Sequence, residues 1–349
     1  MKRRQVAILF LLCVVLNPWL YGFNSYTYRK QEQIVNPYQV YTYEILGSDI
    51  QKLASTYPGI IEYTTIGNTA GGRSIWALRL GKGKNCVLLN ASHHASEWLT
   101  TNIVMYMIDR YAKAYMNNEN IGEYNVKDVL DKTSIWFIPM VNPDGVVLQQ
   151  LGVKVFPENI QNKLLQLNNG SMDFKRWKAD IDGIDPNLQY PAAWDNIASS
   201  VLKPLYSDYK GASPLITKEA QEMVEFTYAT QPLITVSYHS SGRVIYWNFH
   251  NKKENLDRDS KIANNLSHIT GYKLVKPVAN PSGGGYKDWF IQEFGRPGFT
   301  IEIGRFVGST NLPVGVFTIE WLRNRDVGLF IASEGYKLYM SGKRIEASP

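Results

Sequence analysis

The sequence predicts a single α/β domain in which helices cover both faces of a parallel or mixed sheet. From Tyr41 onward, short apolar runs typical of strands alternate with longer segments of helical periodicity, a pattern typical of α/β folds. Internal repeats, low-complexity tracts and Pro/Gly-rich linkers are absent from the sequence between positions 41 and 345. At 349 residues the chain is also long enough to bury a large core.

The expected elements are assigned from the period of the apolar residues, which is about 2 for a strand and about 3.6 for a helix. The expected strands are 60–67, 74–81, 85–92, 134–145, 233–240, 244–249 and 298–304. The segment 134–145 ends in the polar residues NPDG. The expected helices are 43–58, 97–115, 217–230, 256–271 and a C-terminal segment, 313–339.

The N-terminus has the layout of an export signal. Residues 1–23 begin with three basic residues and continue with an apolar run from Val6 to Leu16, which is short for a membrane span. The cleavage site is a poor match, so an N-terminal membrane anchor is the alternative. Either way we expect an exported protein, secreted or associated with the cell envelope. Residues 24–40 are expected to be a linker or arm, and 41–345 the folded domain.

The net charge indicates which kinds of partner the protein could bind, and the cysteine count indicates whether it could form a disulfide. The net charge is +6, of which Lys2, Arg3 and Arg4 supply three, so that 6 − 3 leaves +3 without them. No basic run or basic helix face points to nucleic acid, although a mildly basic surface suits an anionic polymer. Cys86 is the only cysteine after position 13, so no internal disulfide is expected. A monomer is the default expectation.

Polar residues gather where the expected strands end. In the stretch NASHHASE, His94 and Glu97 are three residues apart and face the same way on a helical turn. His239 ends a later strand, and ligands in α/β sheets bind at the carboxyl ends of strands. Two histidines and a glutamate form one of the known ligand sets of catalytic zinc. The cluster therefore predicts one Zn²⁺, although a solvated polar turn is the simpler interpretation of His-x-x-Glu alone.

A fourth polar residue supplies a base. Glu302 lies between Ile301 and Ile303 in a β-patterned run, so its carboxylate faces away from their apolar side. An unligated carboxylate near the metal can take a proton from water and pass it to a leaving amine. Together these residues predict metal-assisted hydrolysis of an amide.

Four motifs, in this order, resemble the M14 zinc carboxypeptidase family over about residues 40–340. They are His94-Ala-Ser-Glu97, Asn142-Pro-Asp-Gly145, Ser237-Tyr-His239-Ser and Phe299-Thr-Ile-Glu302. The resemblance implies a single domain with a mixed, mostly parallel eight-stranded sheet. It also implies zinc held by His94, Glu97 and His239, with Glu302 as general base and acid.

The chain departs from the family pattern at the position that recognises a substrate's C-terminus. The family motif matched by residues 185–188 ends in Asn-Arg, and its arginine binds the terminal carboxylate. Asn187 is kept here as an expected substrate-binding residue, but Leu188 replaces the arginine. Leucine cannot donate a bidentate pair to a carboxylate. Ala279 also stands where the family has a tyrosine, so a free C-terminus should not be recognised in the usual way.

The segments GGGYKDWF and PGFTIEIG resemble a bacterial branch of the family, the γ-D-glutamyl-diaminopimelate peptidases. These enzymes cut the stem peptides of cell wall, and their substrate carries a side-chain carboxylate. The expected substrate-binding residues are therefore Arg243, Tyr286 and Lys287. For the two cations, a solvated surface charge is the alternative.

The resemblance also implies supporting roles near the metal. Lys178 matches the position of the family's oxyanion-stabilising arginine, and Arg176, two residues earlier, is the second choice. Asp185 is expected to accept a hydrogen bond from a zinc-bound histidine and to fix its tautomer.

Three functions follow from these observations. The leading prediction is an exported zinc metallopeptidase that cuts peptidoglycan stem peptides between γ-D-glutamate and a diamino acid such as meso-diaminopimelate. The second is a metallocarboxypeptidase with altered carboxylate recognition, acting on ordinary peptides. The third is an inactive cell-wall-binding protein of the same fold, against which the retention of all three ligands and Glu302 argues.

Overall fold

The computed structural model describes residues 33–346, and the predicted signal or anchor at 1–23 lies outside this range. The described chain contains an eight-stranded sheet in the order β1-β2-β6-β3-β7-β10-β8-β9. These strands are β1 (Ile61–Asn68), β2 (Ser74–Leu80), β3 (Asn85–Ala91), β6 (Thr133–Ile138), β7 (Thr235–Ser240), β8 (Val244–Tyr246), β9 (Lys273–Leu274) and β10 (Gly298–Ile303). A separate hairpin pairs β4 (Asn120–Ile121) with β5 (Tyr124–Asn125).

The sheet is mixed, with a parallel centre. Strands β6, β3, β7 and β10 run parallel to one another. Antiparallel pairs join β1 to β2, β2 to β6 and β10 to β8, while the short edge strand β9 is parallel to β8. The predicted single α/β domain with a mixed, mostly parallel eight-stranded sheet is confirmed.

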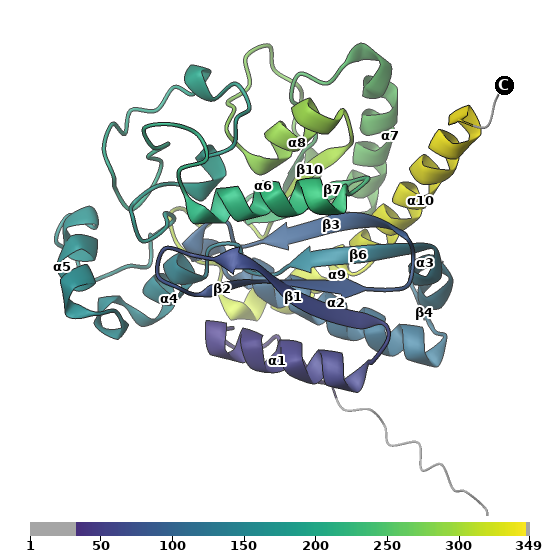
Figure 1. Cartoon of the computed structure of the whole chain (residues 1–349), viewed down its shortest axis with the longest axis horizontal. Helices are drawn as coiled ribbons and strands as arrows, with labels where there is room; N and C mark the ends of the chain where they lie inside the picture. The colour runs from purple at the N-terminus through teal and green to yellow at the C-terminus, as the bar shows by residue number, and fades with distance from the viewer. Residues whose placement is uncertain (1–32, 347–349) are drawn as a thin grey trace, which may run out of the picture. The chain divides into compact units, whose positions relative to one another are not determined.

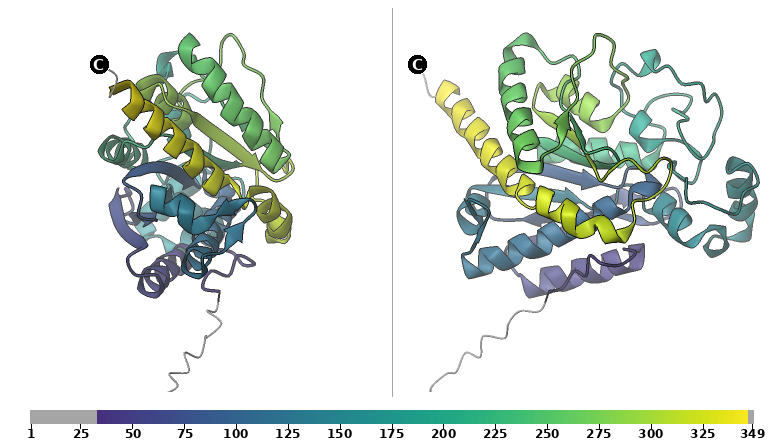
Figure 2. Two further views of the ribbon diagram at one scale, coloured as in Figure 1. Left: turned by 90° about the vertical axis from the view of Figure 1, so that its right-hand side faces the viewer. Right: turned by 180° about the vertical axis from the view of Figure 1, so that it is seen from behind.

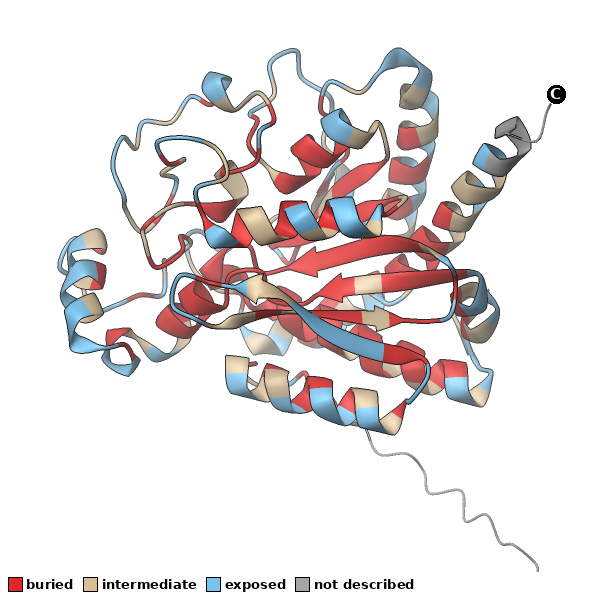
Figure 3. Ribbon diagram, viewed as in Figure 1, coloured by how far each residue is buried: buried red, intermediate tan, exposed pale blue. Residues whose placement is uncertain are grey.

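Helices cover both faces of the sheet (Figures 1 and 2). They are α1 (Tyr43–Thr56), α2 (Leu99–Asn117), α3 (Val126–Lys132), α4 (Pro143–Leu151), α5 (Glu158–Leu167), α6 (Lys218–Thr230), α7 (Lys253–Thr270), α8 (Tyr286–Phe294), α9 (Phe317–Asn324) and α10 (Val327–Glu346). One hydrophobic core joins the sheet to α1, α2, α7, α9 and α10, and a second joins its other face to α6 and α8. Figure 3 shows the central strands buried, whereas the outer part of β1 is exposed.

The two faces of β7 differ in chemistry, and this difference positions the site. Val236 and Tyr238 point into the first core, as expected for a strand buried on both sides. Ser237 and His239 alternate with them and therefore point toward α6 and α8. On the neighbouring β10, Glu302 is the register partner of His239, so both side chains leave the sheet on the same face.

Residues 34–37, which lie within the expected linker or arm, make hydrogen bonds to α2. The backbone N–H groups of Ile34 and Val35 donate to Asp109 Oδ2 of α2 at 2.9 and 3.1 Å. Further along, Asn102 Nδ2 donates to the carbonyl of Pro37 at 2.9 Å. The last part of the expected arm therefore lies along α2.

The C-terminal segment forms two helices and not the single one expected over 313–339. Helix α9 ends at Asn324 and α10 begins at Val327. Between them, the carbonyl of Arg325 accepts a hydrogen bond from the hydroxyl of Tyr111 at 2.6 Å. A side chain from α2 thus takes the place of a helical N–H. Within residues 33–346, no helix is both long and apolar enough to cross a membrane.

Candidate active site

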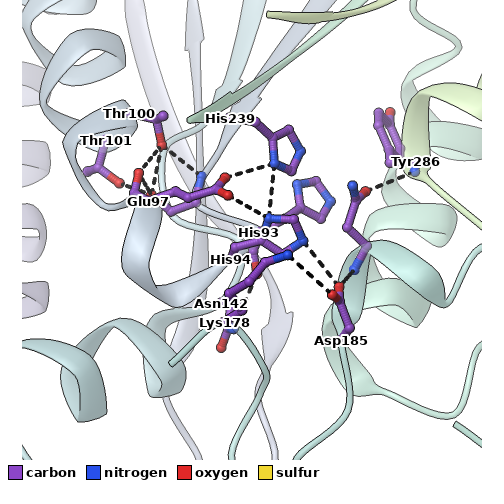
Figure 4. Close-up of polar contacts among 12 residues, drawn as sticks. His93, His94, Glu97, Thr100, Thr101, Asn142, Lys178, Asp185, His239 and Tyr286 are labelled. Carbon is purple, nitrogen blue, oxygen red and sulfur yellow. Dashed lines mark hydrogen bonds and ion pairs between the residues drawn. The ribbon is translucent and has the colours of Figure 1, made fainter. Parts of the chain in front are cut away.

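Three side chains converge at the carboxyl ends of β3 and β7. His94 follows β3 and precedes a short 3₁₀ turn, Ala95–Glu97, which leads into α2, while His239 lies on β7. Glu97 joins the two histidines: its Oε1 is 2.8 Å from His94 Nδ1 and its Oε2 is 2.9 Å from His239 Nδ1 (Figure 4). The ligating atoms of all three residues lie within 4.8 Å of one another.

Buried hydrogen bonds hold the turn that carries His94 and Glu97. Ser92 has a left-handed backbone, with φ of 53°, and its N–H donates to Thr100 Oγ1 at 3.1 Å. Ala95 N–H donates to the carbonyl of Lys178 at 3.1 Å, which ties the turn to a distant loop. The i, i+3 pair expected from the sequence is therefore fixed from two sides.

Asp185 supports His94 from behind. Its Oδ1 lies 3.2 Å from His94 Nε2 and also accepts the N–H of Asn187 at 2.9 Å. Burial alone would raise the pKa of Asp185, but the neighbouring His94 and Lys178 outweigh it and hold this pKa well below its usual range. An ionised carboxylate at Nε2 leaves His94 Nδ1 free to bind a metal, as such partners commonly do.

The charges within the cluster favour a cation. Burial opposes ionisation of Glu97, yet His94 and His239 together hold its pKa well below the ordinary value. Burial also lowers the pKa of His94, but the carboxylate of Glu97 dominates and raises it to about 9 in the metal-free protein. A metal ligand must be deprotonated, so metal binding should release this proton.

The donor set fits zinc. Two imidazole nitrogens and one carboxylate converge on a single point, and a His₂Glu set leaves a fourth position open in catalytic zinc sites. The three residues are at most 8% exposed, and the carboxylate behind His94 completes the arrangement usual for such ligands. His94, Glu97 and His239 would hold the ion.

Glu302 lies beside this cluster but outside it. Its pKa is raised to about 6 by burial and by the charge of Glu97, an effect that the two histidines only partly offset. Such a pKa suits a general base working near neutral pH. Glu302 also borders a pocket of about 310 Å³ between β8, the 275–285 loop and α8.

The pocket combines an apolar wall with one buried ion pair. Lys287 and Asp288, at the start of α8, contact each other directly, and their side chains are only 8% and 11% exposed. Lys287 Nζ also donates to the carbonyl of Asn248 at 3.3 Å. Leu188, which stands where the family pattern has a carboxylate-binding arginine, lines the same pocket. The remaining wall includes Asn187, Tyr246, Trp247, Phe249, Val278 and Lys276.

Comparison with known proteins agrees with this geometry. The Peptidase M14 family, described as zinc carboxypeptidase, matches residues 46–313. The chain belongs to this family. It is 36% identical over 307 residues to γ-D-glutamyl-L-diamino acid endopeptidase 1 of Lysinibacillus sphaericus, covering 87% of this chain and 74% of that protein. It is 30% identical over 286 residues to the uncharacterized protein YqgT of Bacillus subtilis, covering 80% of this chain and 74% of YqgT.

A solved structure shows the same fold. The carboxypeptidase A of Helicoverpa armigera superimposes with a TM-score of 0.65 at 18% identity, covering 86% of this chain and 75% of that one. At this identity the likeness concerns the fold alone. As an M14 family member, the protein is a metallopeptidase of a zinc-dependent family, as predicted.

The two residues suggested for oxyanion stabilisation differ in position. Lys178 Nζ is 4.0 Å from Asp185 and 3.4 Å from Asp208. Burial would lower its pKa, but the carboxylates of Asp185, Glu97 and Asp208 outweigh it and hold this pKa above its usual value. The guanidinium of Arg176 instead stacks on the ring of Tyr206 at 3.8 Å. The metal cluster therefore has Lys178 as its neighbouring cation.

Two of the expected substrate-binding residues point elsewhere. Arg243 donates through Nε to Glu320 at 3.0 Å and lines a separate groove. The hydroxyl of Tyr286 is hydrogen-bonded to Thr227 at 2.8 Å in the second core, although its backbone N–H donates to Asn187 Oδ1 at 3.1 Å. Of the four residues expected from the sequence, Asn187 and Lys287 line the pocket beside Glu302.

The structure adds residues that the sequence did not single out for the site. Asn142 caps α4 and donates through Nδ2 to the carbonyls of His93 and Ala179 at 3.2 and 3.0 Å, which fixes the loop behind the M14 metal site. Asp288 lies in the pocket beside Lys287. In the sequence, Asp288 was indicated only by its place in the segment GGGYKDWF, which resembles the γ-D-glutamyl-diaminopimelate peptidases.

Proposed function

We propose that the protein is an exported zinc metallopeptidase that hydrolyses the amide bond between γ-D-glutamate and a diamino acid in peptidoglycan stem peptides. A relative sharing 36% identity over most of the chain is named for this type of bond. Export rests on the predicted signal or anchor in residues 1–23 and on the need to reach cell wall.

The observation that carries the substrate proposal is the Lys287–Asp288 pair in the pocket beside Glu302. The side chain of diaminopimelate ends in an ammonium and a carboxylate on one carbon. A wall that offers one cation and one carboxylate, both nearly buried, complements both charges of that group. Val278, Trp247 and Phe249 supply apolar surface for the methylene groups that precede it.

Leu188 explains which substrates the pocket disfavours. It offers no donor to a free α-carboxylate next to the scissile bond, and a bidentate arginine pair is among the stronger polar contacts available to proteins. A chain that continues beyond the diamino acid is therefore accepted as readily as one that ends there. This favours an endopeptidase or a stem-peptide amidase over trimming of ordinary peptides.

Each residue of the site has a separate role in the proposed hydrolysis. His94, Glu97 and His239 would hold the zinc ion, which would supply Lewis acidity to the substrate carbonyl and to water. Glu302 takes a proton from water and later delivers it to the amine nitrogen of the departing diamino acid. Lys178 interacts electrostatically with His94, Glu97 and Glu302, and it stabilises the negative charge that develops on the carbonyl oxygen.

The test is incubation of the zinc-loaded full-length chain with L-Ala-γ-D-Glu-meso-diaminopimelate, followed by mass spectrometry. We expect release of diaminopimelate, lost in a Glu302→Gln variant. Release of single C-terminal residues from ordinary peptides, with the stem peptide untouched, would instead favour the carboxypeptidase alternative. Binding of stem peptide with no cleavage of either substrate would favour the inactive wall-binding protein.

A further inference from the structure

Behind His239, several buried polar atoms have no hydrogen-bond partner within residues 33–346. They are Nδ2 and Oδ1 of Asn90, Oγ of Ser237, Nδ1 of His93 and Nε2 of His239. None of the four residues is more than 2% exposed. Buried polar atoms in native proteins are nearly always paired with protein or with ordered water, so a group of five calls for a common partner.

These atoms belong to one cluster on the α6 and α8 face of the sheet. Asn90 on β3 is the register partner of Ser237 on β7, and the side chains of such partners lie next to each other. Ser237 and His239 are two residues apart on β7 and share a face. The ring of His93 stacks on that of His239, with centroids 5.6 Å apart and 20° between the planes (Figure 4).

The cluster includes a ring nitrogen of one metal ligand, His239 Nε2, which has no hydrogen-bond partner within the described residues. His94 uses Nδ1 toward the metal position and has Asp185 at Nε2. His239 also turns Nδ1 toward Glu97, so its Nε2 is the nitrogen left over. A metal-bound histidine almost always donates its second N–H to an acceptor, which fixes the ring's orientation.

We propose that an internal water molecule accepts this hydrogen bond from His239 and is itself held by His93, Asn90 and Ser237. His93 Nε2 is 2.9 Å from the hydroxyl of Tyr190. When Nε2 carries the proton and donates it to Tyr190, Nδ1 is left as an acceptor for the water. Asn90 and Ser237 offer the further acceptors and donors that a buried water needs, since such waters make about three hydrogen bonds.

His93 is on this basis a positioning residue that acts on the metal through His239. The two histidine ligands are then supported differently, His94 by a carboxylate and His239 by neutral groups through water. Without the water-mediated bond, the His239 ring loses the contact that aims Nδ1 at the ion. The inference rests on zinc binding by His94, Glu97 and His239 and not on the identity of the substrate.

The test compares zinc affinity in the full-length chain by competition with a chelator. His93→Phe keeps a flat ring on His239 but removes both ring nitrogens, Nδ1 and the Nε2 that bonds Tyr190. Ser237→Ala leaves His93 intact and removes one side chain that holds the water. We expect zinc to bind about 10-fold to 100-fold more weakly in His93→Phe, with a smaller loss in Ser237→Ala. The absorption spectrum of the Co²⁺-loaded protein should change as well, because it reports ligand geometry directly.

Tyr238→Phe is the matched control. It removes another buried hydroxyl without a partner from the same strand, but on the opposite face of the sheet, and should leave zinc affinity unchanged. Thermal unfolding in EDTA shows whether each variant is folded without metal. A folded His93→Phe protein with unaltered zinc affinity and Co²⁺ spectrum would overturn the proposal.

A second measurement uses the wild-type protein alone. In a high-resolution crystal structure of the zinc-loaded wild-type protein, we expect a water within hydrogen-bonding distance of His239 Nε2. A protein group bonded directly to that nitrogen, or no water beside it, would refute the inference. Neither readout involves peptide cleavage, so the substrate proposal can fail while this one stands, and the reverse.

Discussion

Replacing Lys287 with methionine should remove the preference for diaminopimelate over lysine in the substrate. Stem peptides that carry one or the other differ by a single carboxylate at the end of the side chain, which is the group assigned to Lys287. Methionine keeps much of the volume of the lysine stem and removes the charge. The comparison therefore isolates one contact between the enzyme and its substrate.

The expected size of the effect follows from the surroundings of the ammonium. Lys287 is 8% exposed at its side chain, and truncating one partner of such a buried charge pair typically costs roughly 2–5 kcal/mol. Asp288 lies against it, and burial already raises the pKa of this carboxyl, so protonation of Asp288 limits the penalty. We expect the lower half of the range, about 2–3 kcal/mol, or about 30-fold to 150-fold in relative kcat/KM.

The assay measures kcat/KM of the wild-type and variant proteins on both peptides. The wild type should favour the diaminopimelate peptide, and Lys287→Met should cut both peptides at similar rates. Taking the ratio of the two substrates cancels any general damage to the site. Lys276→Met is the control, since this exposed lysine lines the same pocket and its loss should leave the ratio unchanged. An equal loss on both peptides in Lys287→Met would refute the reasoning and leave Lys287 a purely structural role.

Four further predictions concern the metal site. The value of kcat/KM should fall as the pH drops through about 6, because Glu302 must be ionised to accept a proton and its pKa is raised to about 6. A pH profile of kcat/KM measures this, and an acid limb far from pH 6 would count against Glu302 as the base. Lys178→Ala should lower kcat about 100-fold or more in steady-state assays, whereas Arg176→Ala, whose charge stacks on an aromatic ring, should change it little. Asp185→Asn should weaken zinc binding about 10-fold to 100-fold in chelator competition, and unaltered affinity would contradict its support of His94. Calorimetry in buffers of different ionisation enthalpy should detect about one proton released per zinc below pH 9, since His94 has a pKa of about 9 before the metal binds.

The central sheet was predictable because its strands are buried on both faces and therefore read as apolar runs bounded by polar ends. The break between α9 and α10 was not predictable, because it depends on Tyr111, which lies 214 residues before Arg325. Helix α8 was also missed. It has nine residues and follows a glycine-rich loop, which gives helical periodicity little length over which to show.

The convergence of the three expected metal ligands was predictable for a different reason. His94 and Glu97 are close in sequence, and His239 ends a strand, so elementary topology brings them together. The surroundings of these ligands depend on side chains from distant segments, such as the hydroxyl of Tyr190 that meets His93 across 97 residues. Arg243 illustrates the converse, since its position directly after β7 suggested a substrate contact, while Glu320 on α9 pairs with its charge.

In the turn at residues 185–188, Leu188 replaces the arginine of the family pattern, whereas Asp185 and Asn187 are kept. The contacts of these residues suggest a reason for the difference. Asp185 supports a metal ligand, and Asn187 Oδ1 accepts the N–H of Tyr286, which joins this turn to the start of α8. Each therefore has a structural partner that a change of residue would break. Leu188 lines the pocket and has no such side-chain bond to the metal site, so a different residue there can alter recognition while the metal site is kept. The bond between Asn187 and Tyr286 in turn places Lys287 on the pocket wall. We therefore assign the carboxylate at the end of the diamino-acid side chain to Lys287, while position 188 offers no charge to a carboxylate.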